Sequence, residues 1–344
     1  MQQIYLVLTE RCNLTCSHCI RDSSPYRSET AELVLMQGAL SQIKQEYPEA
    51  TVLLTGGEPT IYKGFDILLD TCISYGLDTI VNTNGATGYF RRADLGVIAA
   101  NKVLVQVSID GSRTQHDLIR GPGTFDRSTS TLRLLVSAGI RCSVSVTVME
   151  QNFFNGADEL IAELESLGLT HIAIKRATYA GRSSAGTPLT SAEWNAGVYS
   201  LRSRVSKTPV RMTPMFDFHA LSALSDAQVA SIAPGPFDTN CGAGTAKVYV
   251  YPDGDVCGCT CFRDIPIGNL NSDALVEIIR SYNPPQVKSD TCISCRYFSA
   301  CRGGCLGSGY RYTSVLGAPD PRCGAVATGE SGRSPIDVTQ GSTA

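Results

Sequence analysis

The chain has 344 residues, of which 43% are hydrophobic and 18% are charged. This balance is typical of a soluble globular protein, and it excludes a disordered or coiled-coil chain. The 29 Lys and Arg residues against 32 Asp and Glu residues give a formal net charge of −3, so the chain has no excess of cations with which to bind nucleic acid. The 14 cysteines are too few for a small disulfide scaffold, and we interpret them first as metal ligands.

The amino terminus and the apolar runs indicate the compartment. The start, Met1-Gln-Gln-Ile-Tyr, lacks the basic segment and the long apolar segment of a secretory signal. No apolar run approaches the roughly 18 residues that are needed to cross a bilayer. We therefore predict a cytoplasmic protein without membrane contact, whose cysteines stay reduced and available to metals.

In the first part of the chain, β-rich runs alternate with helical patterns. Strands are predicted at residues 4–8, 51–55, 79–82, 103–109, 141–148 and 171–174. Helices are predicted between them at residues 31–46, 64–75, 93–100, 127–138 and 155–167. Six such units predict an α/β fold with a parallel sheet, a partial (β/α)6 barrel over residues 1–190.

The rest of the chain divides into three regions. A bridging region, 191–240, begins with a predicted helix at 191–206, for which Thr190 and Glu193 form a capping box. Residues 241–325 hold Cys241 and 8 further cysteines among many glycines, a composition that needs metal to stabilise it as a domain. Residues 326–344 are low in apolar content and are predicted to be a disordered tail.

Three cysteines follow the first predicted strand in the run Cys12-Asn-Leu-Thr-Cys16-Ser-His-Cys19. Catalytic groups of such barrels lie at the carboxyl ends of strands. The spacing lets one loop wrap an iron-sulfur cube, but a closed cube takes four Cys ligands, so one iron is left open for substrate or cofactor. A structural zinc site is the alternative, but it would need a fourth ligand nearby, and the next cysteine is Cys72.

This run resembles the CxxxCxxC loop of radical S-adenosylmethionine (SAM) enzymes, with His18 at the position that is usually aromatic. In that family the open iron binds the amino and carboxylate groups of SAM. The resemblance implies that Cys12, Cys16 and Cys19 hold a SAM-binding cluster. His18 is expected to pack near the adenine, and a role as fourth ligand is disfavoured because it would close the site.

Further matches to the same family follow successive predicted strands. Gly56-Gly57-Glu58-Pro59 resembles the GGEP motif, whose glycine backbone and Glu hold the SAM amino group. By the same resemblance, Ser108 contacts the ribose or carboxylate of SAM, and Arg120 binds the carboxylate. The alternative for Arg120 is a surface salt bridge. The SAM-binding residues implied are Gly56, Gly57, Glu58, Asn84, Ser108 and Arg120.

The cysteine-rich region resembles the SPASM domain that follows the barrel in one radical SAM subfamily. Its seven matching cysteines are Cys241, Cys259, Cys292, Cys295, Cys301, Cys305 and Cys323. The family pattern implies one auxiliary cluster held by Cys292, Cys295, Cys301 and Cys323. It implies another held by Cys241, Cys259 and Cys305, which is one ligand short because residues 234–240 contain no cysteine.

Four cysteines have no place in this pattern. Cys257 and Cys261 alternate with Cys259 along an extended stretch, so they point to its opposite face if it is a strand. Either could complete the auxiliary cluster, although an open iron is favoured, and Cys257 could instead donate a hydrogen atom to a substrate radical. Cys72 and Cys142 are interpreted as small buried hydrophobic residues.

The resemblance implies a radical SAM/SPASM maturase. Such an enzyme makes a 5′-deoxyadenosyl radical and abstracts hydrogen from a ribosomally synthesised peptide, forming a crosslink, a thioether or an oxidised residue. The cofactors implied are SAM and three [4Fe-4S] clusters, one of them binding SAM. No catalytic acid or base is assigned, although Asp217 and His219 are candidates. The loops at the barrel mouth, which include residues 175–188, are expected to choose the substrate.

The partners implied are a precursor peptide and a reductant such as flavodoxin or ferredoxin. The chain begins at its first barrel strand, so we expect a separate leader-binding protein. A radical SAM dehydrogenase or epimerase acting on a small molecule is the alternative, since its motifs would look the same. A sulfatase-maturing enzyme is less favoured because Thr260, where Asp is expected, follows Cys259. A non-enzymatic metal-stapled binding protein would leave the GGEP motif and the open site without a purpose.

Overall fold

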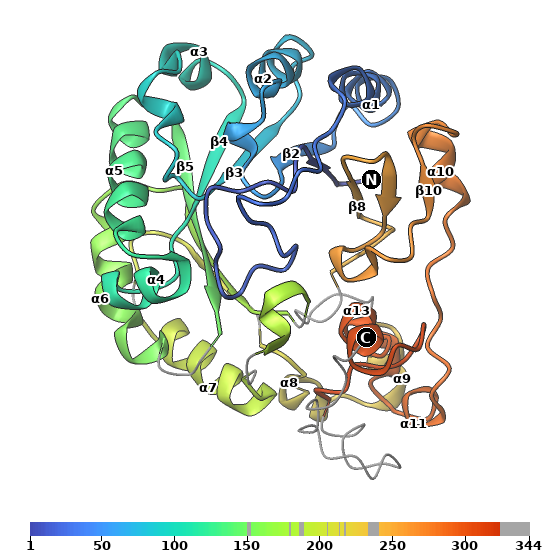
Figure 1. Cartoon of the computed structure of the whole chain (residues 1–344). Helices are drawn as coiled ribbons and strands as arrows, with labels where there is room; N and C mark the ends of the chain where they lie inside the picture. The colour runs from blue at the N-terminus through green and yellow to red at the C-terminus, as the bar shows by residue number, and fades with distance from the viewer. Residues whose placement is uncertain are drawn as a thin grey trace, which may run out of the picture. The chain divides into compact units, whose positions relative to one another are not determined.

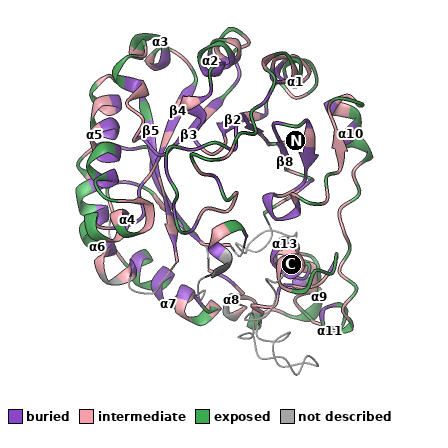
Figure 2. Cartoon of the chain, in the orientation of Figure 1, coloured by how far each residue is buried: buried purple, intermediate pink, exposed green. Residues whose placement is uncertain are grey.

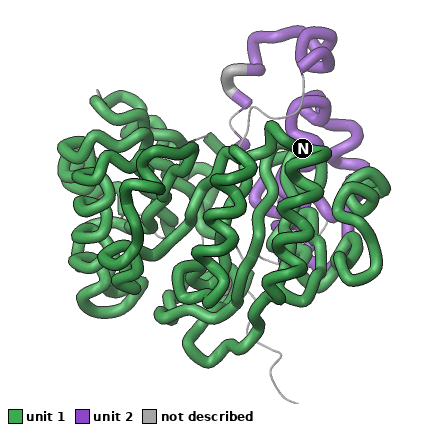
Figure 3. Tube along the Cα trace, turned by 90° about the horizontal axis from the view of Figure 1, so that it is seen from above, with its two compact units in different colours: residues 1–215, 241–284 green, residues 216–240, 285–344 purple. Residues whose placement is uncertain are grey.

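The computed structural model describes residues 1–149, 153–178, 180–185, 189–204, 206–212, 214–216, 218–232 and 241–323. The chain forms two compact units (Figure 3). The first contains Met1–Met215 and Cys241–Pro284, and the second contains Phe216–Asn240 and Pro285–Ala344. The proposed disordered tail, 326–344, and the stretch 234–240 lie outside the described residues.

The first unit is built on one sheet. Six parallel strands are hydrogen-bonded in chain order: β1 (Gln3–Val7), β2 (Thr51–Thr55), β3 (Thr79–Thr83), β4 (Val103–Ser108), β5 (Arg141–Val148) and β6 (His171–Arg176). These are the six predicted strands, with ends shifted by at most two residues. They confirm the α/β class and the partial (β/α)6 barrel.

Further strands extend this sheet at both edges. Next to β6 lies β7 (Val210–Arg211), in parallel. Next to β1 lies β8 (Lys247–Val250), also in parallel, followed by the antiparallel β9 (Asp255–Cys257) and β10 (Gly268–Asn269). The start of the cysteine-rich region therefore shares the barrel sheet, so the compact units divide the chain at other positions than the domain boundaries proposed from the sequence.

Helices cover the outer side of the sheet (Figure 1). They are α1 (Leu33–Glu46), α2 (Phe65–Ser74), α3 (Leu95–Ala99), α5 (Thr124–Ser137) and α6 (Phe153–Glu165). On α1 the buried residues Met36, Leu40 and Ile43 recur every three or four positions, which puts them on the face that packs on the sheet. Burying each such side chain contributes about 1.5–3 kcal/mol, and both the strands and these helices carry buried residues (Figure 2).

Two helices show what local sequence does and does not predict. The helix α7 (Ser191–Arg202) begins at the predicted capping box, in which Thr190 and Glu193 each bond the backbone of the other. It ends four residues earlier than predicted. The helix α4 (Arg113–Arg120) was not predicted, because it is polar and buries only His116. A capping box of Ser112 and Gln115 starts it in place of an apolar stripe.

The remaining described elements are short. In the first unit they are η1 (Pro59–Ile61), η2 (Tyr89–Arg91), η3 (Gly181–Ala185), η4 (Thr260–Phe262) and α10 (Leu275–Ser281). In the second they are α8 (His219–Ser222), α9 (Asp226–Ala230), α11 (Asp290–Ile293), α12 (Phe298–Cys301) and α13 (Leu306–Thr313). Within the described ranges, no helix is long and apolar enough to pass through a bilayer.

Candidate active site

A cavity of about 330 Å³ lies in the first unit at the carboxyl ends of β2 to β6. The inner face of each strand contributes polar side chains to its wall, because successive residues of a strand alternate between the core and the cavity. These polar residues include Thr55, Asn82, Gln106, Ser108, Ser145 and Thr147. Eight of the site residues predicted from the sequence also line this cavity: Cys12, Cys16, Cys19, Gly56, Gly57, Asn84, Ser108 and Arg120.

The three cysteines lie on the loop between β1 and α1. Cys12 and Cys16 are 7% and 8% exposed, and Cys19 is half-buried. The backbone N–H of Leu14 donates to Cys12 Sγ at 3.4 Å, and that of Ser23 donates to Cys19 Sγ at 3.3 Å. Such N–H donors favour the thiolate form, which is the form that binds metal.

Burial acts in the opposite direction on these thiols. It raises the pKa of Cys12 to about 12 and also raises the pKa of Cys16. Without a metal, these thiols therefore stay protonated at neutral pH. A cationic metal centre reverses this preference, because ligation takes place through the thiolate and releases the proton.

The donor set fits a cluster better than a single ion. Among the residues that the structure describes, no three Cys, His, Asp or Glu side chains are placed to hold one metal ion. A zinc ion requires its sulfur ligands about 2.3 Å from one centre. An iron-sulfur cube is larger and tolerates cysteines farther apart, and three cysteines that line one cavity, two of them with N–H donors, suit it.

Gly56 and Gly57 lie directly against the start of the cysteine loop. The N–H of Gly57 donates to the Thr9 carbonyl at 2.7 Å. A Cβ at Gly57 would lie 2.9 Å from the carbonyl oxygen of Glu10 and closer still to that of Arg11. Gly56 has a φ of +159° and faces the Thr9 backbone. The two glycines are required for this close backbone approach.

Glu58 is fully buried and does not line the cavity. Its Oε1 accepts hydrogen bonds from the backbone and hydroxyl of Thr60 and from the hydroxyl of Thr83, at 2.7–3.2 Å. Its Oε2 accepts from the backbone N–H of Asn84 at 2.8 Å. Burial raises the pKa of Glu58, and these four donors satisfy the carboxylate. Glu58 therefore ties the turn after β2 to the end of β3.

The two polar residues after β3 and β4 face the cavity. The Asn84 amide donates to Asn13 Oδ1 at 2.9 Å and lies 3.7 Å from Cys12 Sγ, so Asn84 contacts the cysteine loop itself. Ser108 ends β4 and is half-buried at the cavity wall. Both side chains therefore border the cavity, and their contact with a bound cofactor stays a prediction.

A buried charge network centred on Asp110 supports the cavity wall. Asp110 is 2% exposed, and its Oδ2 lies 2.5 Å from Arg120 Nε and 2.6 Å from His18 Nε2. Its Oδ1 accepts from the Thr147 backbone at 2.8 Å. Burial alone would raise the pKa of Asp110, but Arg120 and His18 outweigh it and hold this pKa well below its usual range. Asp110 thereby joins α4, β5 and the cysteine loop.

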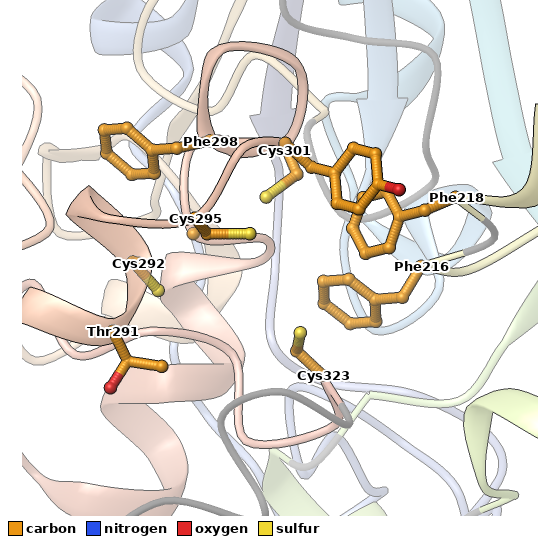
Figure 4. A pocket seen from close by; sticks show the side chains of 10 residues that line it. Phe216, Phe218, Thr291, Cys292, Cys295, Phe298, Cys301 and Cys323 are labelled. Carbon is orange, nitrogen blue, oxygen red and sulfur yellow. The ribbon is translucent and has the colours of Figure 1, made fainter. Parts of the chain in front are cut away.

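A second cavity, of about 300 Å³, lies within the second unit (Figure 4). Four cysteine sulfurs in its wall face the same space. Aromatic rings complete the wall, and two of them, Phe218 and Tyr297, stack with their centroids 4.4 Å apart. The four cysteines are Cys292, Cys295, Cys301 and Cys323, the set proposed from the sequence for one auxiliary cluster.

The other proposed auxiliary ligands lie in different units. Cys241 is exposed and Cys259 half-buried in the first unit, whereas Cys305 belongs to the second. Backbone N–H groups donate to two of these sulfurs, from Cys261 to Cys259 and from Ser308 to Cys305, both at 3.4 Å. A cluster on these three cysteines stays a prediction.

The cysteines outside the pattern are buried. Cys257 is fully buried against Val7, Tyr249 and Tyr251, and burial raises its pKa to about 12. Cys261 is 2% exposed. Cys72 and Cys142 are 0% and 2% exposed, as expected for small core residues.

Sequence reasoning missed several residues that hold the site together. Asp110 follows β4, but its two partners, His18 and Arg120, come from other segments. Arg182, after β6, contacts the cysteine loop, and no local pattern signals this contact. Of the candidate bases, Asp217 and the side chain of His219 lie outside the described residues.

Two protein-family models match the chain. The model of the radical SAM superfamily matches residues 6–164, and that of the SPASM iron-sulfur cluster-binding domain matches residues 241–305. The chain belongs to the radical SAM superfamily and carries a SPASM domain. It is therefore an enzyme that uses iron-sulfur clusters and SAM.

Its relatives include two proteins named for maturation and one named for the biosynthesis of a bacteriocin. The chain is 31% identical to the mycofactocin maturase MftC of Mycolicibacterium smegmatis, over 92% of this chain and 81% of that protein. It is 30% identical to the sporulation killing factor maturation protein SkfB of Bacillus subtilis, over 79% of this chain and 63% of that protein. The subtilosin biosynthesis protein AlbA of Bacillus subtilis is 25% identical over 80% of this chain and 58% of that protein.

Solved structures share the fold. Streptococcus suis SuiB bound to the precursor peptide SuiA superposes with a TM-score of 0.76 and 17% identity, covering 94% of this chain and 75% of that one. The enzyme anSMEcpe with bound AdoMet gives a TM-score of 0.68 and 17% identity, covering 95% and 92% of the two chains. At these identities the likeness shows the fold alone.

Proposed function

We propose that this enzyme modifies a ribosomally synthesised precursor peptide, forming a crosslink, a thioether or an oxidised residue. The observation that carries this proposal is the 31% identity to a mycofactocin maturase across both the barrel and the SPASM region. Two further relatives are named for maturation of a killing factor and biosynthesis of a bacteriocin. These relatives favour a peptide over a small molecule as substrate.

The first cavity is the proposed site of SAM and its cluster. Cys12, Cys16 and Cys19 would hold the cluster and leave one iron for SAM. Two auxiliary clusters would bring the total to three. One takes Cys292, Cys295, Cys301 and Cys323, and the other takes Cys241, Cys259 and Cys305 with one iron open. When bound, the first cluster and SAM supply the 5′-deoxyadenosyl radical that removes hydrogen from the peptide.

The chain's own residues bind and orient SAM. The backbone of Gly56 and Gly57 faces the cavity and is proposed to accept the SAM amino group. The Nε of Arg120 donates a hydrogen bond to Asp110, and the other two guanidinium nitrogens are proposed to bind the SAM carboxylate. Ser108 and Asn84 border the same space. Glu58 accepts the backbone N–H of Asn84, and we propose that Glu58 contributes by orienting this backbone.

The substrate-binding part of the site is proposed at the loops after β6. Lys175, Arg176, Ala177 and Thr178 line the cavity together with the cysteine loop. Together with the cysteine loop they would exclude water from a radical held there, which prevents its quenching by solvent hydrogen. A peptide entering at this end would place one residue beside the reactive carbon of SAM.

Two protein partners complete the proposal. A reductant such as flavodoxin or ferredoxin would supply the electron that starts each turnover. A separate leader-binding protein would present the precursor peptide. The SuiB complex with SuiA shows that this fold can hold a precursor peptide, which supports the substrate class.

The test is anaerobic co-expression with the short open reading frames that neighbour this gene, followed by fragment mass spectrometry of each peptide. A crosslink or an oxidation appears as a loss of two hydrogen atoms at an assigned residue. The matched control replaces Cys12, Cys16 and Cys19 by Ala, and the mass change must vanish with it.

Two outcomes would contradict the proposal. In the first, SAM is cleaved, but every candidate peptide keeps its mass in ordinary water and gains no deuterium when the reaction is run in deuterated water. A small molecule would then be the substrate. If the triple Cys variant still modifies a peptide, the site assignment is wrong.

A further inference from the structure

One residue far along the chain binds the backbone of the cysteine loop. Arg182 lies in η3, after β6, and its backbone N–H donates to the Cys19 carbonyl at 3.0 Å. Its side chain donates from Nε to the Cys16 carbonyl at 2.9 Å and from Nη2 to the Ser23 carbonyl at 2.6 Å. These bonds connect positions 159 to 166 residues apart in the sequence.

The carbonyl contacts of Arg182 matter more than its ion pair. Nη1 of Arg182 lies 2.5 Å from Asp22 Oδ1, but these side chains are 27% and 56% exposed, and exposed pairs contribute little. Cys16 and Ser23 are 8% and 1% exposed, so their carbonyls cannot easily exchange Arg182 for water. The planar guanidinium reaches both carbonyls and the carboxylate at once, which a lysine ammonium cannot do.

The residue before Arg182 must be glycine for this contact to form. Gly181 has a φ of +58°, and a Cβ there would lie 2.7 Å from the Ile20 carbonyl oxygen and closer still to that of Cys19. Gly168 is a useful comparison, since it has a φ of +70° but nothing within 4 Å of its Cβ position. Both glycines adopt a left-handed conformation, but only Gly181 is pressed against the loop.

The cysteine loop itself has a conformation that needs support. Asp22 adopts a φ of +53°, which is uncommon for a residue other than glycine. Such a backbone persists when surrounding contacts hold it. The contacts from Gly181 and Arg182 converge on residues 16 to 23, which include two of the proposed cluster ligands and this strained position.

We propose that Gly181 and Arg182 are positioning residues that hold residues 16–23 in the ligand-bearing conformation before a cluster binds. The inference rests on the proposed ligand role of Cys16 and Cys19. It assigns a second task to the segment after β6, whose residues also line the cavity where substrate is proposed to bind. The order of the loop is then built into the protein fold and does not depend on the metal.

The test separates loop order from metal binding. In a background with Cys12, Cys16 and Cys19 replaced by Ala, no first cluster forms, so hydrogen exchange of residues 16–23 reports on the protein alone. Arg182→Met and Gly181→Ala should speed this exchange at least about tenfold, because buried carbonyl bonds are lost. Arg182→Lys should resemble Arg182→Met, since charge without the planar fork does not restore the bonds.

Matched controls are available in the same unit. Gly168→Ala carries the same backbone strain without the contact. Arg204→Met removes an arginine of similar exposure, 22%, which bonds Asp158 and Glu165. Both should leave exchange at residues 16–23 unchanged. If Gly181→Ala does not fold, Arg182→Met still decides the question.

A second readout uses the loaded enzyme with its native cysteines. Arg182→Met should lose about four iron atoms per chain to a chelator faster than the parent does, while the auxiliary iron stays. Unchanged exchange in Arg182→Met, or equal acceleration in the controls, would overturn the proposal. Failure of the ligand assignment would look different: the triple Ala variant would then keep its full iron content.

Discussion

Replacing Asp110 by Asn is expected to destabilise the first unit strongly. Asn keeps the size of Asp but has one acceptor oxygen where Asp110 uses two, and it carries no charge. The Arg120 side chain, 9% exposed, would lose the carboxylate that balances its buried charge. Removing one partner of a buried ion pair costs about 3–5 kcal/mol, and the short contact to His18 is weakened at the same time.

The assay follows the free energy of unfolding by intrinsic fluorescence. The chain has 1 tryptophan, Trp194, which is fully buried in the first unit and therefore reports on that unit. Glu163→Gln is the control, because it breaks an ion pair between two exposed side chains, Glu163 at 41% and Arg133 at 53% exposure. It should lower the free energy of unfolding by only about 0–1 kcal/mol.

A double variant tests the cause of this loss. Asp110→Asn combined with Arg120→Met removes both charges, so it should cost clearly less than the sum of the two single changes. Strict additivity, or a single-variant loss no larger than that of Glu163→Gln, would refute the reasoning.

Three further predictions follow from the same structure. Replacing Cys12, Cys16 and Cys19 by Ala should abolish SAM cleavage and lower the iron content from about twelve to about eight atoms per chain, measured by colorimetric iron analysis. Burial lowers the pKa of His116 from 6.5 to about 4, so the fold favours the neutral ring and loses stability as pH falls between these values. Between pH 7 and pH 5 the free energy of unfolding of the native chain should fall by about 2 kcal/mol more than that of His116→Gln. Denaturant unfolding at each pH measures this, and parallel pH profiles of the two proteins would contradict it. Cys257→Ser should lower the melting temperature but leave the iron content unchanged, because Cys257 is packed in the core; a loss of iron would instead make it a ligand.

Local patterns predicted the six central strands because each is a short run of β-branched and apolar residues. The short strands β8 to β10 were not assigned to the barrel, since nothing in a run of two to four residues tells which partner it joins. The polar helix α4 was missed for the related reason that its start depends on a capping box and its single buried residue on a tertiary contact.

The candidate site shows the same limit. The cysteines and glycines stand in local motifs with fixed spacing, so the sequence places them at the cavity. The partners of Asp110 and the target of Arg182 lie in other segments, and only the folded backbone brings them together. Local spacing also could not show that Thr60, Thr83 and Asn84 would donate hydrogen bonds to the Glu58 carboxylate, and the contact of Glu58 with a bound cofactor stays a prediction.

The parallel pairing of β1 with β8 has a consequence for how the protein is made. Gln3 pairs with Lys247 and Leu6 with Val250, so β1 cannot form this pairing until β8 is synthesised, more than 240 residues later. Until then, one edge of β1 exposes unpaired backbone groups that could pair with another nascent chain. Contacts so distant in sequence also slow folding. A barrel cut off before β8 would keep this open edge permanently, so the cysteine-rich region cannot be removed as a detachable module without exposing the sheet to aggregation.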